Sequence, residues 1–229
     1  MTKTELMQSV RAAIDRRAED IIAVGEEIRH HPELGFKEFK TSRLVAQTFE
    51  RMGLAPRTGL ALTGVRADAA GRGGDGPTFA LLGELDALVV AGHPVADPET
   101  GAAHACGHNA QVAGMLGAAM GLLDAKAFDH LAGRVAFIGV PAEEYGDVAW
   151  RVTQRNAGKL EFLGGKPEML RLGHLDDVDM AMMIHATPRS EEGKFAIPVS
   201  NNGCVVKTVR YIGKAAHAGG MPHVGINAL

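Results

Sequence analysis

The sequence predicts an α/β protein in which helices flank a mainly parallel or mixed β-sheet. Segments with the apolar spacing of a helix alternate along the chain with short, β-branched apolar runs that are typical of buried strands. One helical segment is rich in glycine and alanine, so it can pack closely against a sheet. The chain has 229 residues, of which 46% are hydrophobic and 22% charged, and this is enough to form a sizeable core.

We expect a helix at the start of the chain and a second one soon after it. Thr2 and Glu5 have the spacing of a capping box, and the apolar stripe that follows continues until the chain reaches Pro32. The second helix covers about 38–52 and ends at Gly53, since glycine commonly takes the left-handed conformation just after a helix.

Two strands are predicted next, at about 63–68 and 78–85. The segment GRGGDG between them, at 71–76, matches the G-x-G-x-x-G pattern of dinucleotide-binding loops. That pattern requires a helix after the glycines, whereas here a proline and an apolar strand follow. We therefore reject nucleotide binding and interpret the segment as a hairpin connection between the two strands.

The alternation of helices and strands continues through the middle of the chain. After a polar loop at 91–104, a helix rich in small residues is predicted at about 107–125. The apolar runs 134–140 and 178–185 have the composition of buried strands, and a short helix is expected between them at 167–172.

The pattern changes near residue 196. The run 203–212 alternates apolar and polar residues as a half-exposed strand does, and a helix is expected to begin near residue 222. We interpret 1–196 as one domain and 197–229 as the beginning of a second.

Composition and charge argue against several classes of protein. The net charge of −3 lacks the basic excess of a nucleic-acid-binding protein, and the longest low-charge run, 109–123, is shorter than the about 20 apolar residues of a membrane-spanning helix. Two cysteines cannot build a disulfide scaffold. The first ten residues lack the apolar stretch of a signal peptide, so we expect a cytoplasmic location. Ten histidines against one tryptophan and two tyrosines suggest a site built from imidazole groups.

The segment HACGHNA places Cys106 and His108 two residues apart at the start of a predicted helix. In an extended loop, residues at this spacing point to the same side. A thiolate and an imidazole can there converge on a metal ion, and the positive end of the helix dipole favours the anionic ligand. The alternative is a buried structural cysteine next to a surface histidine.

Three predicted strands also end in residues that bind metals. Glu143 and Glu144 follow one apolar strand, and because adjacent side chains diverge, one could bind a metal while the other holds a proton. His185 ends a second strand, and Glu84 and Asp86 lie at the end of a third. Taken singly, these residues could form a solvated acidic turn or a histidine satisfied in the core. Taken together they favour a metal site, for which mixed ligands suit zinc and tolerate manganese or cobalt.

Six motifs occur in an order that resembles one enzyme family. They are HPELGFKEFKTS (31–42), LLGELDAL (81–88), HACGHN (104–109), VPAEEYGD (140–147), LDDVDMAMMIH (175–185) and GKAAHAGGMPHVGINAL (213–229). The sequence is similar to the dinuclear-metal amidohydrolases related to aminoacylase and carboxypeptidase G. It is most similar to their p-aminobenzoyl-glutamate hydrolase and indole-acetyl-amino-acid hydrolase branches.

The resemblance implies a zinc-exopeptidase-like catalytic domain and the beginning of an inserted α+β dimerisation domain. It implies two divalent ions, which are zinc or manganese and in some cases cobalt. The implied reaction is hydrolysis of the amide bond of small N-acyl or aminoacyl amino acids, such as aminobenzoyl-glutamate or dipeptides. The implied partner is a second copy of the full-length chain, without nucleic acid or membrane.

The resemblance also assigns roles to the candidate residues. It implies that Cys106 bridges the two metal ions, that His108 binds one of them and that His185 binds the other. Glu144 resembles a further metal ligand, and Glu143 resembles the general base.

Other positions follow or depart from the family pattern. Asp86 resembles the acidic residue that supports the ligands in the family's H-x-D motif, while Glu84 occupies the histidine position of that motif. His217 resembles the histidine of the dimerisation domain that reaches across the dimer to the carbonyl oxygen of the substrate. Asn109 replaces an aspartate found in many relatives, and 147–164 form a longer connection than usual.

Two alternatives to a metalloamidohydrolase remain open. We expect the family's last metal-binding histidine to lie outside this chain, so the 229 residues alone are expected to be inactive, as a fragment that binds metal or ligand without catalysis. The other alternative is a cysteine hydrolase with Cys106 as nucleophile, in which the glutamate pair would have no role. Arg151, Arg155 and Lys159 are expected to lie on a solvated helix face rather than to contact the substrate.

Overall fold

The computed structural model describes residues 1–187, 195–197, 203–207 and 209–229. The chain divides into two compact units, residues 1–188 and residues 189–229, and each is described by itself.

The first unit alternates helices and strands, as the sequence predicts. Its α-helices are α1 (Lys3–Arg16), α2 (Ala18–His30), α3 (Phe39–Arg51), α4 (His108–Asp124), α5 (Val148–Asn156) and α6 (Gly165–Arg171). Its strands are β1 (Arg57–Leu60), β2 (Gly64–Ala70), β3 (Thr78–Glu84), β4 (Leu88–Val89), β5 (Ala102–Ala103), β6 (Arg134–Val140) and β7 (Met180–Met183).

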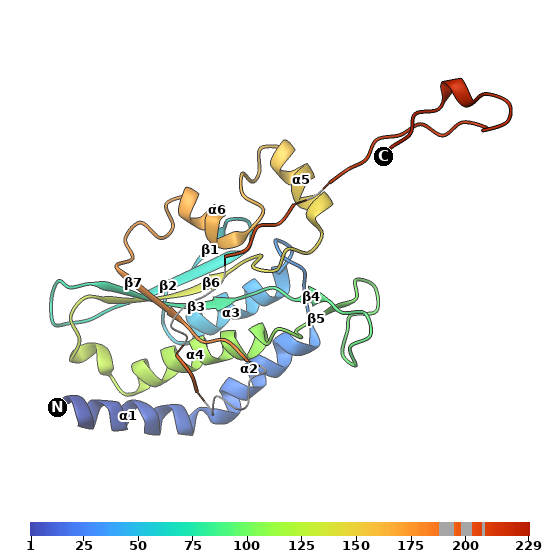
Figure 1. The fold of residues 1–229 in the computed structure, drawn as a ribbon. Helices are drawn as coiled ribbons and strands as arrows, with labels where there is room; N and C mark the ends of the chain where they lie inside the picture. The colour runs from blue at the N-terminus through green and yellow to red at the C-terminus, as the bar shows by residue number, and fades with distance from the viewer. Residues whose placement is uncertain (188–194, 198–202, 208) are drawn as a thin grey trace. The chain divides into compact units, whose positions relative to one another are not determined.

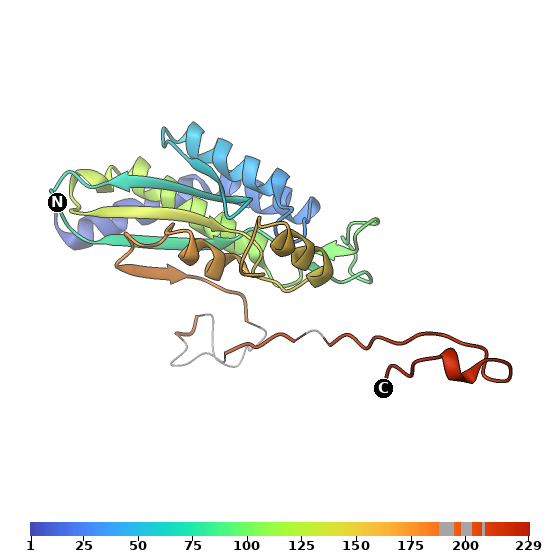
Figure 2. The ribbon, with the colours of Figure 1, turned by 90° about the horizontal axis from the view of Figure 1, so that it is seen from above.

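Five strands form one sheet in the order β1-β2-β6-β3-β7, which Figure 2 shows from above. β3 pairs in parallel with β6 on one side and with β7 on the other, whereas β1, β2 and β6 pair in antiparallel fashion. The sheet is therefore mixed, and the predicted α/β fold class is confirmed. Because β6, β3 and β7 are parallel, the residues that follow these three strands meet at one edge of the sheet.

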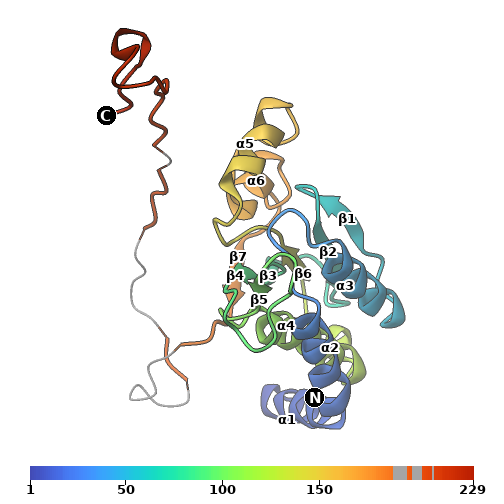
Figure 3. The same ribbon diagram turned by 90° about the vertical axis from the view of Figure 1, so that its right-hand side faces the viewer.

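Helices cover both faces of the sheet (Figure 1, Figure 3). On one face, α2, α3 and α4 pack through a core in which Phe49 of α3 contacts Phe137 of β6, with ring centroids 6.2 Å apart. On the other face, α6 and the segment before it bring Met169 and Leu160 into a second core with Ile138 of β6. Phe137 and Ile138 are adjacent, so their side chains point to opposite faces of the sheet.

Small residues allow α4 to lie between the sheet and the first two helices. A Cβ on Gly83 of β3 would come within 3.1 Å of the Val112 Cα atom in α4. A Cβ on Gly117 of α4 would come within 2.8 Å of the Ile21 side chain in α2. The helix predicted to be rich in small residues thus packs closely on both sides, which fixes the height of its N-terminus relative to β3.

The opening helix differs from the prediction because it is two helices rather than one. The capping box is present: the Glu5 N–H donates to the Thr2 hydroxyl, and the Thr2 N–H donates to the Glu5 carboxylate. The helix is interrupted at Arg17, whose guanidinium bonds Asp124 at the end of α4 (Nε–Oδ2 2.8 Å) and also pairs with Asp20. This break lets both α1 and α2 follow the surface of α4.

The predicted hairpin between β2 and β3 is wrong, because β6 lies between these two strands. The loop 71–77 passes over the turn that leads into β6 instead. Its glycines permit this contact: a Cβ on Gly71 would come within 2.1 Å of the Leu131 carbonyl oxygen. The strand β3 and not a helix follows the loop, which agrees with the rejection of a dinucleotide-binding motif. The short strands β1, β4 and β5 were not predicted from the sequence, whereas α5 contains Arg151 and Arg155, for which a helix face was expected.

The second unit contains little regular structure among its described residues. The strand predicted at 203–212 is wrong, since neither 203–207 nor 209–212 is in a strand. A single bridge joins Lys214 and Ile226, and a 3₁₀-helix at Pro222–Val224 replaces the predicted α-helix. A strand needs a neighbour for its backbone hydrogen bonds, and the described part of this unit supplies none for that segment.

Among the helices in the described ranges, none combines the length and the apolar character that crossing a membrane requires.

The contact between Phe49 and Phe137 makes a testable contribution to stability. Phe49 is fully buried, so Phe49→Ala should lower the free energy of unfolding by about 3–5 kcal/mol in chemical denaturation. Phe39→Ala is the matched control on the same helix, because Phe39 is 62% exposed. It should change stability by less than about 0.5 kcal/mol. Equal effects of the two substitutions would contradict the described core.

Candidate metal centre

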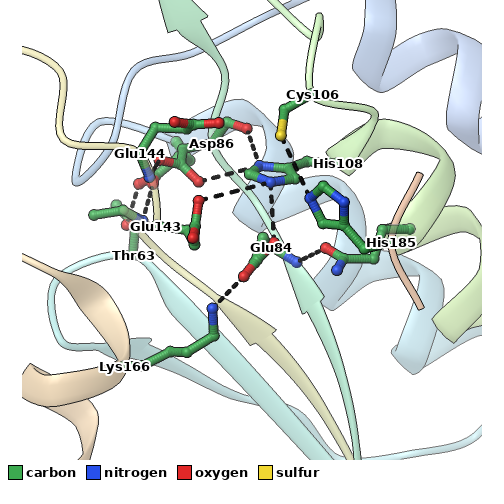
Figure 4. Close-up of polar contacts among 12 residues, drawn as sticks. Thr63, Glu84, Asp86, Cys106, His108, Glu143, Glu144, Lys166 and His185 are labelled. Atoms are coloured by element: carbon green, nitrogen blue, oxygen red, sulfur yellow. Dashed lines mark hydrogen bonds and ion pairs between the residues drawn. The ribbon is translucent and has the colours of Figure 1, made fainter. Parts of the chain in front are cut away.

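The ends of β3, β6 and β7 and the N-terminus of α4 bring seven predicted site residues into one cluster (Figure 4). These residues are Glu84, Asp86, Cys106, His108, Glu143, Glu144 and His185. The eighth, His217, belongs to the second unit, where it is exposed and its Nδ1 accepts the Gly220 N–H at 2.9 Å. Its approach to the substrate therefore stays a prediction.

His108 lies at the centre of the cluster and is completely buried. Its Nδ1 is 2.9 Å from the backbone carbonyl oxygen of Asp86 and 3.5 Å from the Asp86 carboxylate. Its Nε2 faces Glu84 Oε2 at 3.0 Å and Glu143 Oε2 at 3.9 Å. A backbone acceptor on Nδ1 is the usual way in which proteins orient a histidine that binds a metal through Nε2.

Charge around His108 strongly favours a cation at this position. Burial alone would lower the pKa of His108, but the nearby carboxylates of Asp86 and Glu84 raise it to about 10. The imidazole therefore holds a second proton when no other cation is present. A divalent ion at Nε2 can take the place of that proton.

Glu84 is buried and stays ionised. Burial raises the pKa of its carboxyl group, but His108 and Lys166 outweigh this and lower the pKa to about 2. Lys166, from α6, forms an ion pair with Glu84 Oε1, and the Glu84 N–H donates to Gln111 Oε1 at 2.7 Å. The Gln111 amide in turn donates to the Ile184 carbonyl oxygen at 2.6 Å, so Gln111 ties the end of β3 to the end of β7.

Glu143 and Glu144 play different parts in the cluster, as their adjacent positions require. The Glu144 backbone N–H donates to Asp86 Oδ2 at 2.8 Å, which fixes this turn against the end of β3. The side chain of Glu143 is 37% exposed and faces His108. Burial and the charge of Glu84 raise the pKa of Glu143 above that of an ordinary glutamate.

Cys106 contacts His185, with 3.4 Å between Sγ and Nε2, although 79 residues separate them in the sequence. Burial raises the pKa of the Cys106 thiol to about 12, and the carboxylates of Glu144, Glu143 and Glu84 contribute in the same direction. The thiol is thus a poor nucleophile on its own. A metal ion would reverse this, because a thiol that coordinates a metal loses its proton.

The donor atoms fit a metal centre. Two groups share His108, namely Cys106–His108–His185 and Glu84–His108–Glu143, and within each group the ligand atoms lie within 4.8 Å of one another. His108 Nε2, Glu84 Oε2 and Asp86 Oδ1 are buried but make no hydrogen bond of normal geometry. Buried oxygen and nitrogen atoms of this kind need a partner, and a cation provides one. Sulfur, imidazole and carboxylate ligands together suit zinc, and also manganese or cobalt.

The expectation that Arg151 lies on a solvated helix face is wrong, because this residue is completely buried. Its guanidinium donates to the carbonyl oxygens of Glu144 (2.6 Å) and Leu163 (2.7 Å) and lies over the Phe36 ring. Arg155 and Lys159 are exposed, as expected. The long connection after the glutamate pair thus contains α5, and Arg151 joins this helix to the backbone of Glu144.

Comparison with known proteins agrees with this geometry. Residues 80–222 match the sequence model of peptidase family M20/M25/M40. The chain belongs to this family. It is 30% identical to thermostable carboxypeptidase 2 of Saccharolobus solfataricus, over 98% of this chain and 54% of that protein. It is 30% identical to the N-acyl-L-amino acid amidohydrolase of Geobacillus stearothermophilus, over 100% of this chain and 57% of that protein.

Solved structures of M20 proteins share the fold. The dinuclear metal-binding M20 peptidase YXEP of Bacillus subtilis superposes with a TM-score of 0.59 at 30% identity, over 78% of this chain and 44% of that chain. The aminobenzoyl-glutamate utilization protein of Klebsiella pneumoniae has a TM-score of 0.55 at 22% identity, over 77% and 46%, and shows the fold alone. This M20 chain spans about half the length of the curated relatives that it matches. The predicted resemblance to a family of metal-dependent hydrolases is confirmed.

Cobalt binding tests the thiol ligand of this M20 chain directly. Titration of the metal-free protein with Co²⁺ should produce a near-ultraviolet band from sulfur-to-cobalt charge transfer, and Cys106→Ser should abolish it. Cys204→Ser is the matched control, because Cys204 is the other free cysteine and lies in the second unit. A band that survives in Cys106→Ser but disappears in Cys204→Ser would contradict the described centre.

Proposed function

We propose that the protein is a metal-dependent amidohydrolase that cleaves the amide bond of N-acyl or aminoacyl amino acids. The observation that supports it best is the convergence of Cys106, His108 and His185 beside a half-exposed carboxylate, Glu143. Membership of the M20 family supports the same reaction class. Aminobenzoyl-glutamate, other N-acyl amino acids and dipeptides are the proposed substrates.

Each residue of the centre has a proposed task. Cys106, His108, Glu144 and His185 would hold two divalent ions, with Cys106 as the ligand common to both. When bound, the ions polarise the scissile carbonyl group and make the attacking water more acidic. Glu143 accepts the proton of that water and delivers it to the nitrogen of the departing amine.

Asp86 keeps two of these groups in place through short contacts. Its backbone carbonyl oxygen holds His108 Nδ1, and its carboxylate accepts the Glu144 N–H. His217 from a partner subunit is the proposed hydrogen-bond donor to the carbonyl oxygen of the substrate, where negative charge develops. The functional form would accordingly be a homodimer.

Zinc is the proposed metal, with manganese and cobalt as the alternatives that the ligand set accommodates. A cytoplasmic location is proposed as well, because both cysteines are free and a reducing compartment keeps them so.

Replacement of the proposed base separates its role from that of the ligands. Glu143→Gln should lower turnover of an N-acyl amino acid by about 10²–10⁴-fold, because no carboxylate is left to move the proton. Its metal content, measured by atomic emission, should equal that of the wild type. Glu144→Gln is the adjacent comparison and should lower the metal content. Wild-type turnover in Glu143→Gln would show that another group is the base.

One contact favours a second candidate, a cysteine hydrolase, because Cys106 Sγ lies 3.4 Å from His185 Nε2. Removal of metals discriminates between the two reactions. Dialysis against a chelator should abolish hydrolysis, and added Zn²⁺ or Mn²⁺ should restore it. Activity that persists after the metal content has fallen to zero would favour the thiol mechanism. Two tightly bound ions per chain would argue against a fragment that only binds ligand.

A further inference from the structure

The motif HPELGFKEFKTS, at 31–42, has no role in the reaction described so far, yet it reaches the centre through Glu38. The Glu38 side chain is completely buried. Its Oε1 accepts the backbone N–H of Ala142 at 2.7 Å, and its Oε2 accepts the hydroxyl hydrogen of Thr63. Both oxygens of the carboxylate are thus used, one of them on the residue just before Glu143.

Ala142 has an unusual backbone conformation. Its φ is +48°, in the left-handed region where a residue with a side chain is disfavoured. The hydrogen bond from Ala142 to Glu38 and a second one from the Gly165 N–H to the Ala142 carbonyl oxygen (2.9 Å) hold this peptide from both sides. Backbone strain that persists near a functional site requires support of this kind from the surrounding structure.

The turn at Ala142 determines the direction in which the next two residues leave the end of β6. Glu143 then faces His108, and the Glu144 N–H donates to Asp86 (Figure 4). The carbonyl oxygen of Glu144 accepts a hydrogen bond from Arg151. Three buried side chains, those of Glu38, Asp86 and Arg151, therefore hold the backbone of Ala142 and Glu144, the residues on either side of Glu143.

We propose that Glu38 is a positioning residue, which holds Ala142 in the left-handed conformation and so aims Glu143 at the attacking water and Glu144 at the metal. This inference rests on the proposed function for the roles of Glu143 and Glu144. Glu38 and Ala142 are 104 residues apart in the sequence. Their contact links the loop between α2 and α3 to the loop that follows β6 and carries Glu143.

The main test compares kinetic constants of metal-loaded variants. Glu38→Ala should lower kcat by about 10²-fold with little change in KM, because a small displacement of a catalytic group has an effect of this size. Glu38→Gln should stay within a few-fold of the wild type, because its amide oxygen can accept from Ala142 and its NH₂ can donate to Thr63. A loss in Glu38→Gln as large as in Glu38→Ala would overturn the positioning role.

A matched control variant measures how much the loss of any buried carboxylate changes the stability and kcat of the protein. Glu168 is also completely buried and accepts two backbone N–H groups, those of Glu161 and Phe162, outside the cluster. Glu168→Ala should lower the melting temperature as Glu38→Ala does but should keep kcat within a few-fold. If both variants lose kcat in proportion to their loss of stability, Glu38 is only structural and the proposal is wrong.

Glycine at position 142 tests the conformational part of the argument. Glycine adopts positive φ without a steric penalty, so Ala142→Gly should restore part of kcat when it is added to Glu38→Ala. Absence of any recovery would contradict the role of Glu38 in holding this φ. If Glu38→Ala does not fold, Thr63→Val replaces it: loss of the second hydrogen bond lets the carboxylate turn, which should lower kcat several-fold. An unchanged kcat in Thr63→Val would then overturn the proposal.

A readout that does not need turnover keeps this proposal separate from the proposed function. Because Glu144 follows the same turn, Glu38→Ala should change the visible absorption of the Co²⁺-loaded protein, while Glu168→Ala should not. If the wild type hydrolyses no N-acyl amino acid, the proposed function fails, and the cobalt spectra alone decide on Glu38. Identical spectra for the wild type and Glu38→Ala would contradict the positioning of Glu144.

Discussion

Three neighbouring strands, β6, β3 and β7, run parallel, and the candidate centre depends on that alignment. Their carboxyl ends lie at the same edge of the sheet, so Glu143, Glu84 and His185 meet there although they belong to distant parts of the sequence. Helix α4 completes the cluster because close packing on Gly83 sets the height of its N-terminus, which carries His108. A shift of one residue in any of these pairings would move a ligand to the opposite face of the sheet.

The concentration of negative charge at this edge is the second constraint on the structure. Glu84 and Asp86 are buried beside His108, and only one nearby lysine, Lys166, is paired with Glu84 among the residues that the structure describes. Without a metal, the cluster holds extra protons: burial and carboxylates raise the pKa of the Cys106 thiol, and carboxylates raise that of His108. Divalent ions remove the need for those protons, so the same charges that would destabilise an empty cluster favour metal binding.

Much of the centre follows from the sequence, because its ligands lie directly after apolar runs whose nature as strands is evident. For this reason Glu143 and His185 lie just after β6 and β7, as the sequence predicts. Arg151 and Glu38 could not be placed, since their roles rest on contacts with backbone groups far away in the sequence. The hairpin expected at 71–76 failed for a similar reason: local spacing does not reveal that β6 inserts between β2 and β3. The alternation at 203–212 predicted a strand that 203–207 and 209–212 do not form. Periodicity reports a preference for the extended conformation, but it does not show whether a pairing partner is present.

We propose that metal ions bind at the edge where these strands end, with Cys106 as a shared ligand. The most direct measurement is a crystal structure of the zinc-loaded protein with anomalous diffraction data collected on both sides of the zinc absorption edge. We expect two anomalous peaks, both within bonding distance of Cys106 Sγ, with His108 next to one and His185 next to the other. Peaks found only at exposed carboxylates, with Cys106 free of metal, would contradict the account.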